Sequence, residues 1–171
     1  MTIRNLDRLL QPRSVALIGA TPKPEHVGNV VLRNLRAGGF AGRLMLVNPH
    51  HAEIDGLPVH ADVASLPEAP DLAVIATPAE TVPGLVAALG EHGGKAALVI
   101  SAGFGGSAEG RRLTQAVLEA ARPHLLRIVG PNCVGLLLPH LGLNASFVHL
   151  PPAPGRLAFL AQSGAIPYRG R

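Results

Sequence analysis

Short apolar runs alternate along this chain with longer segments whose apolar residues recur at helical spacing. Each run is too short for a helix and is followed by glycine, proline or small polar residues. The runs cover residues 14–19, 43–47, 71–76, 96–101 and 126–129. Because strands this uniformly apolar are covered on both faces, the pattern is typical of a parallel sheet between helices. The sequence therefore predicts an α/β fold with a doubly wound, Rossmann-like parallel sheet.

Helices are predicted between these strands. Apolar residues three and four positions apart mark the segments 28–36, 81–92 and 108–122. Gly38-Gly39 and Gly93-Gly94 end the first two segments, and Pro123 ends the third. Thr81 is the predicted N-cap of the second helix, with Pro83 in its first turn.

The alternation of strand and helix patterns ends after residue 133, and this change predicts the domain organisation. Residues 1–133 are predicted to form the Rossmann-like domain. Residues 134–161, Leu-rich pieces separated by Pro and Gly, predict a short C-terminal extended or hairpin appendage. We expect residues 162–171 to be the truncated start of a following domain.

Composition and charge exclude several classes of protein. The chain is 47% hydrophobic, which rules out disorder, and its one cysteine cannot form an internal disulfide. No apolar stretch approaches the roughly 20 residues of a membrane span. The 15 Lys and Arg residues are scattered and only 3% of residues are aromatic, unlike a nucleic-acid-binding surface. We therefore expect a cytoplasmic protein with no membrane or nucleic-acid partner, whose net charge of +4 mildly attracts anionic ligands.

Small and polar residues follow every predicted strand. Since the carboxyl ends of parallel strands share one edge of the sheet, these turns together predict a ligand site there. The turns are Gly19–Thr21, Asn48–His50, Ala76–Pro78, Ser101–Gly103 and Gly130–Asn132.

The first two turns narrow the class of ligand. Gly28, near the start of the first helix, would let a pyrophosphate approach the backbone. The dinucleotide fingerprint and the Walker pattern are both absent. After the second strand stands Asn48-Pro49-His50-His51 rather than the acidic residue that an NAD ribose requires. Coenzyme A and NADP are therefore both compatible with these turns, and NAD is disfavoured. A third alternative is an interaction domain that binds no small ligand.

Two other kinds of site find little support. The eight His residues are dispersed without metal-ligand spacing, so no metal site is predicted. Cys133 has no neighbouring His or acid to activate it and is expected to be a small packed thiol near the ligand. Phe104 and Phe147 either cover a ligand or fill the core.

Seven motifs link the chain to a known family, in order across about residues 6–165. They are Ser14-Val-Ala-Leu-Ile-Gly-Ala20, Asn34-Leu-Arg-Ala-Gly-Gly-Phe40, Val47-Asn-Pro49, Pro70-Asp-Leu-Ala-Val-Ile75, Ser101-Ala-Gly-Phe104, Gly130-Pro-Asn-Cys133 and Ala161-Gln-Ser-Gly-Ala165. These motifs resemble the CoA-binding domain of the NDP-forming acyl-CoA synthetases, which the succinyl-CoA synthetase alpha subunit shares. Residues 9–14, 33–40 and 142–147 look most like the N-terminal part of bacterial Pat-type protein lysine acetyltransferases, which fuse a synthetase-like region to a GNAT domain.

The resemblance implies coenzyme A or acyl-CoA as the ligand. By position in the motifs, Gly19, Thr21, Pro22 and Lys23 would contact the phosphates of the ligand, and Asn48, Pro49 and His50 would contact its adenosine end. Thr77 and Pro78 match the family's third-strand turn, and Ser101, Gly103 and Phe104 would lie toward the thiol. Asn132 and Cys133 would lie beside the pantetheine arm. Many members have Lys near His50, so a weaker or pH-sensitive phosphate contact is expected there.

Two departures from the family bear on activity. Many synthetases carry Glu two residues after Gly-Phe, where Gly105-Gly106 follow Gly103-Phe104 here. The phosphorylated His of the family lies in a next domain, and Ala165–Arg171 does not continue the family pattern. The resemblance thus implies a CoA-binding module that is catalytically incomplete alone. The parent would be of the acetate–CoA ligase type, or an acetyltransferase with this part as a regulatory region. Partners would be CoA and downstream synthetase-like domains; an NADP-binding oxidoreductase domain is the alternative.

Overall fold

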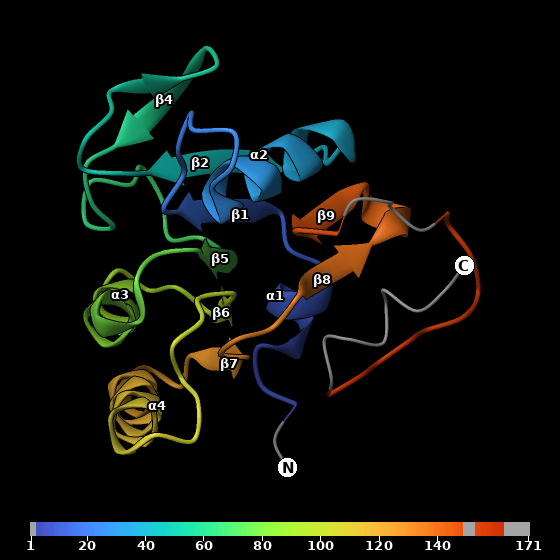
Figure 1. Cartoon of the computed structure of the whole chain (residues 1–171). Helices are drawn as coiled ribbons and strands as arrows, with labels where there is room; N and C mark the ends of the chain where they lie inside the picture. Colours follow the sequence, from blue (N-terminus) through green and yellow to red (C-terminus); the bar gives the residue numbers. More distant parts are fainter. Residues whose placement is uncertain (1–2, 149–152, 163–171) are drawn as a thin grey trace.

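The computed structural model describes residues 3–148 and 153–162 and contains a seven-stranded sheet (Figure 1). The five strands predicted from the apolar runs form its parallel centre. They are β1 (Ser14–Ile18), β2 (Arg43–Val47), β5 (Leu72–Ile75), β6 (Ala96–Val99) and β7 (Arg127–Val129). The antiparallel hairpin of β3 (Glu53–Ile54) and β4 (Leu57–His60), which sequence analysis missed, extends the sheet beyond β2. The strand order is β3-β4-β2-β1-β5-β6-β7, which confirms the doubly wound sheet.

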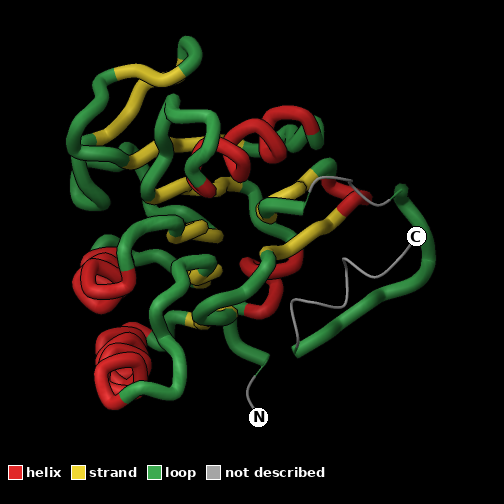
Figure 2. Tube along the Cα trace, viewed as in Figure 1, coloured by secondary structure: helices red, strands yellow, loops and turns green. Residues whose placement is uncertain are grey.

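Helices cover both faces of this sheet (Figure 2). One face carries α2 (Val27–Ala37), and the other carries α3 (Val82–Glu91) and α4 (Ala108–Ala121), which pack against each other. A short helix, α1 (Leu6–Leu10), packs beside β6 through the buried Leu9. Single 3₁₀ turns occupy Ala79–Thr81, Arg122–His124 and Pro139–Leu141.

Alternate residues of each central strand contribute to two separate cores. In β1, Val15 and Leu17 join the core under α2, whereas Ala16 and Ile18 join the core under α3 and α4. Successive side chains of a strand point to opposite faces, so a strand buried on both sides must be apolar throughout. This explains why the apolar runs predicted the sheet.

α3 starts where predicted, after Thr81 and with Pro83 in its first turn, but without a side-chain capping bond. Thr81 does not cap the helix through its side chain, because a 3₁₀ turn precedes α3 and places Thr81 in helical backbone geometry. Its hydroxyl donates to the carbonyl oxygen of Pro78 at 2.7 Å and lies 2.9 Å from the hydroxyl of Thr77. Thr81 therefore occupies the predicted N-cap position of α3, but its side chain makes no capping bond and instead contacts the turn that follows β5.

The predicted C-terminal appendage contains an antiparallel strand pair, β8 (Gly135–Leu138) and β9 (Leu143–Ser146). β9 packs against α2, and Leu143 and Ala145 lie in the core under that helix. Asn34 of α2 donates from Nδ2 to the carbonyl oxygens of Ser146 and Val148, at 2.8 and 3.1 Å. These contacts hold the strand pair firmly against α2.

The apolar stretch Leu157–Ala161 has neither helix nor strand structure and is exposed. Leu157 is 99% exposed and Leu160 is 100% exposed, so neither contributes to the core of the described domain. Of the predicted domain start at 162–171, all but Gln162 lies outside the described residues.

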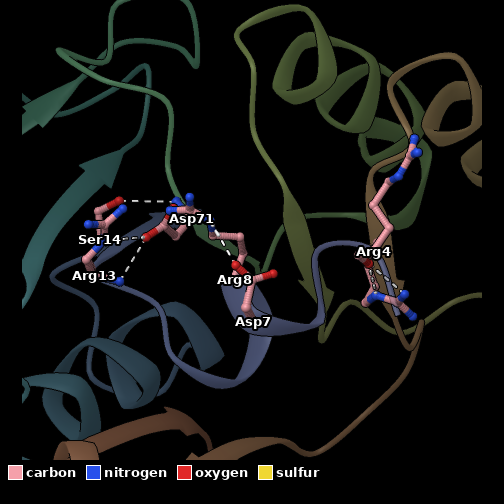
Figure 3. A network of polar contacts seen from close by, with 7 residues as sticks. Arg4, Asp7, Arg8, Arg13, Ser14 and Asp71 are labelled. Carbon is pink, nitrogen blue, oxygen red and sulfur yellow. Dashed lines mark hydrogen bonds and ion pairs between the residues drawn. The ribbon is translucent and has the colours of Figure 1, made fainter. Parts of the chain in front are cut away.

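A buried carboxylate organises the amino-terminal edge of the sheet (Figure 3). The side chain of Asp71 is 12% exposed and accepts hydrogen bonds from Arg8 Nη1 at 2.7 Å and from the backbone N–H of Arg13 at 2.9 Å. The Asp71 N–H donates to the hydroxyl of Ser14 at 3.1 Å. Asp71 thus ties α1 and the loop before β1 to the start of β5.

Candidate functional site at the carboxyl edge of the sheet

The parallel register brings four strand ends into one row. Ile18 of β1 lies beside Val47 of β2 and Ile75 of β5, and Ile75 lies beside Val99 of β6. The turns that follow these strands therefore meet at one edge, as sequence analysis predicted. This edge lies opposite the edge that Asp71 organises.

The turn after β1 packs tightly against the start of α2. A Cβ on Gly28 would lie 2.0 Å from the carbonyl oxygen of Gly19. Gly19 has a φ of +94°, and a Cβ there would lie 2.5 Å from the carbonyl oxygen of Ala76. Close packing of helix on strand therefore requires both glycines. This reason for Gly28 differs from the predicted one, the approach of a pyrophosphate, and any side chain introduced at this position would strike the backbone of Gly19 first.

The amino end of α2 has the chemistry of an anion site. Its N-cap, His26, makes no side-chain capping bond, and the first turn carries no acidic residue. An uncapped helix start presents free N–H groups and a partial positive charge. The buried Asn29 donates from Nδ2 to the carbonyl oxygen of Thr21 at 3.0 Å, which fixes the loop above the helix. In the same loop, Pro22 and Lys23 are exposed.

Hydrogen bonds join the turn after β2 to the turn after β1. Asn48 Nδ2 donates to the carbonyl oxygen of Ala20 at 2.7 Å, and Asn48 Oδ1 accepts the N–H of His50 at 2.8 Å. The Asn48 amide is thereby held in place by backbone groups. Pro49 and His50 are exposed on the surface of this turn.

A pocket of about 600 Å³ lies at the ends of β5, β6 and β7. Its lining residues are Val27, Ala76, Thr77, Ile100, Ser101, Ala102, Asn132, Cys133, Val134 and Phe147. The structure thus brings together four of the residues that the family resemblance implies, Thr77, Ser101, Asn132 and Cys133. Phe147, expected either to cover a ligand or to fill the core, lines the pocket and also packs against the core under α2.

Several predicted contacts lie outside this pocket. Phe104 is half-buried against the core under α3 and α4, which supports its role as core filling. Gly103 has a φ of +107°, and a Cβ there would lie 2.9 Å from the Ala79 side chain. The others that do not line it are Gly19, Thr21, Pro22, Lys23, Gly28, Asn48, Pro49, His50 and Pro78.

The apolar lining of the pocket was not predicted. Val27 comes from α2, Ile100 follows β6, and Val134 precedes β8. Ile100 and Val134 belong to apolar runs, and Val27 belongs to the apolar helical pattern of α2, so each looks like ordinary core in the sequence. The Cys133-Val134 continuation of the last turn was the available signal for Val134.

Cys133 is held as a neutral thiol. Its Sγ donates to the carbonyl oxygen of Val99 at 3.2 Å. Burial raises the pKa of this thiol from the ordinary 9.0 to about 11. Because the thiolate is the nucleophile, burial leaves Cys133 without the activation that a nucleophilic cysteine needs at neutral pH.

Alkylation of Cys133 by iodoacetamide tests this state. At pH 8 the folded chain should react about a hundredfold more slowly than the chain in 8 M urea, because its thiolate fraction is smaller. The folded-state rate should climb between pH 9 and pH 11 as the thiol ionises. The raised pKa also means that the stability which the protonated thiol contributes is complete below pH 9 and is lost as the pH rises through about 11. Equal rates for folded and unfolded chains at pH 8 would contradict the assignment.

Metal chemistry finds no support in the described residues, where no three His, Cys, Asp or Glu side chains are grouped to hold an ion. Among the same residues, no helix has the length and apolar character needed to cross a bilayer.

Comparison with known proteins identifies the family of this chain. Residues 13–139 match the family model described as CoA binding domain. The chain is 42% identical over 162 residues to acetate–CoA ligase [ADP-forming] I of Archaeoglobus fulgidus, covering 94% of this chain and 23% of the relative. It is 38% identical to the alpha subunit of acetate–CoA ligase [ADP-forming] I of Pyrococcus furiosus, covering 95% of this chain and 36% of that subunit.

Solved structures of related proteins have the same fold as this chain. A protein from Pyrococcus horikoshii OT3 superimposes with a TM-score of 0.88 at 36% identity, over 94% of this chain and 37% of that one. The dinucleotide-forming acetyl-coenzyme A synthetase 1 of Ca. Korarchaeum cryptofilum, in complex with phosphate and ADP, superimposes with a TM-score of 0.86 at 36% identity, over 94% of this chain and 34% of that one. The chain spans about a quarter to a third of the length of these relatives. With its family model matched over most of its length, the chain belongs to the CoA binding domain family.

Proposed function

We propose that this chain binds coenzyme A along the carboxyl edge of its sheet, as the CoA-binding part of a protein similar to the ADP-forming acetate–CoA ligases. The observation that carries the proposal is the position of the pocket. It lies beside the uncapped amino end of α2, and Val27 of that helix is part of its lining. One site thus combines N–H groups suited to a diphosphate with a mostly apolar pocket suited to a pantetheine arm.

Each predicted contact receives a role in this proposal. Thr21, Pro22 and Lys23 border the phosphates beside α2. Asn48, Pro49 and His50 border the adenosine end. The thiol end of the ligand enters the pocket between Thr77, Ser101, Asn132 and Cys133. Gly19 and Gly28 shape the backbone on which the phosphates rest, and Pro78, Gly103 and Phe104 belong to the turns that follow β5 and β6.

The activity of the whole protein is a further proposal. A ligase of this type needs parts beyond this chain, since the curated relatives are about three to four times longer than the matched region. Gly105-Gly106 stand where many synthetases carry Glu, which favours a regulatory CoA-binding region of a protein lysine acetyltransferase as the second candidate. In both cases the chain alone supplies the CoA site and no complete reaction.

Titration calorimetry tests the ligand directly. We expect CoA to bind, 3′-dephospho-CoA to bind at least about tenfold more weakly because one charge-assisted phosphate contact is lost, and NAD to give no heat. Binding of NADP without a response to CoA would establish the oxidoreductase alternative instead. No heat with any of the four ligands would overturn the proposal and favour an interaction domain.

A further inference from the structure

The pocket contains side chains that each carry a single transferable proton. Thr77, Ser101 and Cys133 line it with two hydroxyls and a thiol. Such a group either donates its proton to a ligand or, when the proton is already engaged, offers only lone pairs. The partners of these three side chains therefore decide what the pocket can recognise.

The protons of Ser101 and Cys133 are both engaged by backbone carbonyls. Ser101 Oγ donates to the carbonyl oxygen of Ile75 at 3.4 Å and accepts the N–H of Thr77 at 3.3 Å. Cys133 Sγ donates to the carbonyl oxygen of Val99 at 3.2 Å. These carbonyls can only accept, so both side chains present lone pairs to the pocket.

The proton of Thr77 is engaged through a residue outside the pocket. Thr81 has one hydroxyl proton, and the carbonyl oxygen of Pro78, 2.7 Å away, can only accept it. Because one proton cannot serve both contacts, we assign the 2.9 Å contact between the two hydroxyls to the Thr77 proton, with the Thr81 oxygen as acceptor. Thr77 therefore also turns lone pairs toward the pocket. We call Thr77, Ser101 and Cys133 together the acceptor wall.

Part of the backbone near the acceptor wall is already engaged in hydrogen bonds. The N–H of Thr77 is engaged by Ser101, that of Asn132 by the carbonyl oxygen of Ser101 at 3.1 Å, and that of Phe147 by the carbonyl oxygen of Val134 at 3.4 Å. Among the residues that line the pocket none is Lys, Arg, His, Asp or Glu. The side-chain amide of Asn132 retains N–H donors, but Asn132 is exposed.

We propose that the acceptor wall selects neutral groups that donate hydrogen bonds and rejects anionic groups at the thiol end of the ligand. This inference rests on the proposed function, which places that end of CoA in the pocket. A secondary amide or a protonated thiol finds acceptors there, whereas a carboxylate or thiolate faces lone pairs with no cation to offset its charge. The pKa of Cys133, raised by burial to about 11, keeps the wall itself neutral.

The site is therefore polarised along its length. Its α2 end carries the partial positive charge of a helix start without a side-chain cap, and its β5–β7 end carries the acceptor wall. A ligand with an anionic diphosphate and a neutral amide arm fits in one direction only. No residue that lines this pocket is a base that could ionise the thiol for reaction.

Two isosteric CoA thioethers test the acceptor wall. Alkylation of CoA with iodoacetamide gives S-carbamoylmethyl-CoA, which ends in a neutral amide, and iodoacetate gives S-carboxymethyl-CoA, which ends in a carboxylate. Calorimetry at pH 7.5 should show the amide binding about tenfold or more tightly than the carboxylate. Equal affinities, with CoA still bound, would overturn this inference and leave the proposed function intact.

The exposed Thr81 provides a variant that changes proton placement without touching the pocket. In Thr81→Val, the Thr77 proton loses its acceptor and can turn into the pocket, so the amide-to-carboxylate affinity ratio should fall by roughly two- to tenfold. Thr81→Ser keeps the hydroxyl and should keep the ratio. A ratio that is the same in Thr81→Val and the unmodified chain would show that Thr77 does not belong to the wall. Failure of CoA and both thioethers to bind would overturn the proposed function and this inference together.

Discussion

Gly28→Ala should lower the free energy of unfolding by about 3 kcal/mol, because the added methyl group overpacks a backbone contact. The new Cβ would lie 2.0 Å from the carbonyl oxygen of Gly19, and a backbone atom cannot turn aside as a flexible side chain can. To relieve the clash, the start of α2 must move away from the end of β1. This movement also displaces the proposed phosphate site, so CoA affinity should fall together with stability. Urea unfolding and calorimetry measure the two effects.

Gly84→Ala is the matched control. Gly84 lies in α3 without a positive φ, and a Cβ there would meet no atom of a neighbouring element within 4 Å. Alanine at this position should raise the free energy of unfolding by about 0.5–1 kcal/mol through its higher helix propensity, with CoA affinity unchanged. Equal midpoints of unfolding for Gly28→Ala and the unmodified chain would show that α2 does not pack on Gly19 as described.

Asp71→Ala is expected to lower the free energy of unfolding by about 3–4 kcal/mol, because it leaves a partly buried guanidinium without its carboxylate. Arg8 loses an acceptor at 2.7 Å and the Arg13 N–H loses one at 2.9 Å. These bonds tie α1 and the loop before β1 to β5 (Figure 3). The measurement is again urea unfolding, with the slope of the transition checked for two-state behaviour.

Glu68→Ala provides the comparison for Asp71. Glu68 pairs with Arg43 at 3.3 Å, but the two side chains are 42% and 58% exposed, so its loss should change stability by at most about 0.5 kcal/mol. Both acidic residues lie at the edge of the sheet away from the proposed CoA site. The folded fraction of each variant should therefore bind CoA normally, unlike Gly28→Ala. A small effect of Asp71→Ala, similar to that of Glu68→Ala, would contradict the structural role of Asp71.

Most of the fold could be predicted from the sequence, because strands that are buried on both faces of a sheet appear as continuous apolar runs. β1 and β6 are buried throughout, and their apolar runs marked them. The β3–β4 hairpin was missed because β3 has only two residues. Asp55-Gly56, both with positive φ, form its turn, and this dipeptide between Ile54 and Leu57 was the signal that could have revealed it.

Only part of the candidate site could be predicted from the sequence. Small and polar residues at strand ends identified the edge, and four of the pocket residues, Thr77, Ser101, Asn132 and Cys133, were among those predicted. Val27 and Phe147 were not assigned to it, because apolar residues in a helix or beside a strand are normally core. Their place in the pocket follows from α2 and the β8–β9 pair packing together.

The sequence by itself determined the parallel sheet, the helices on its two faces and the edge where the turns meet, since these depend on local periodicity and on residues that end strands. Only the tertiary structure decided which atoms approach one another across that edge. The contact between Gly28 and Gly19, and the carbonyl oxygens that engage the protons of Ser101 and Cys133, join residues that are not neighbours in the chain. Such contacts leave no periodic trace in the sequence, because each depends on the positions of a few atoms after packing.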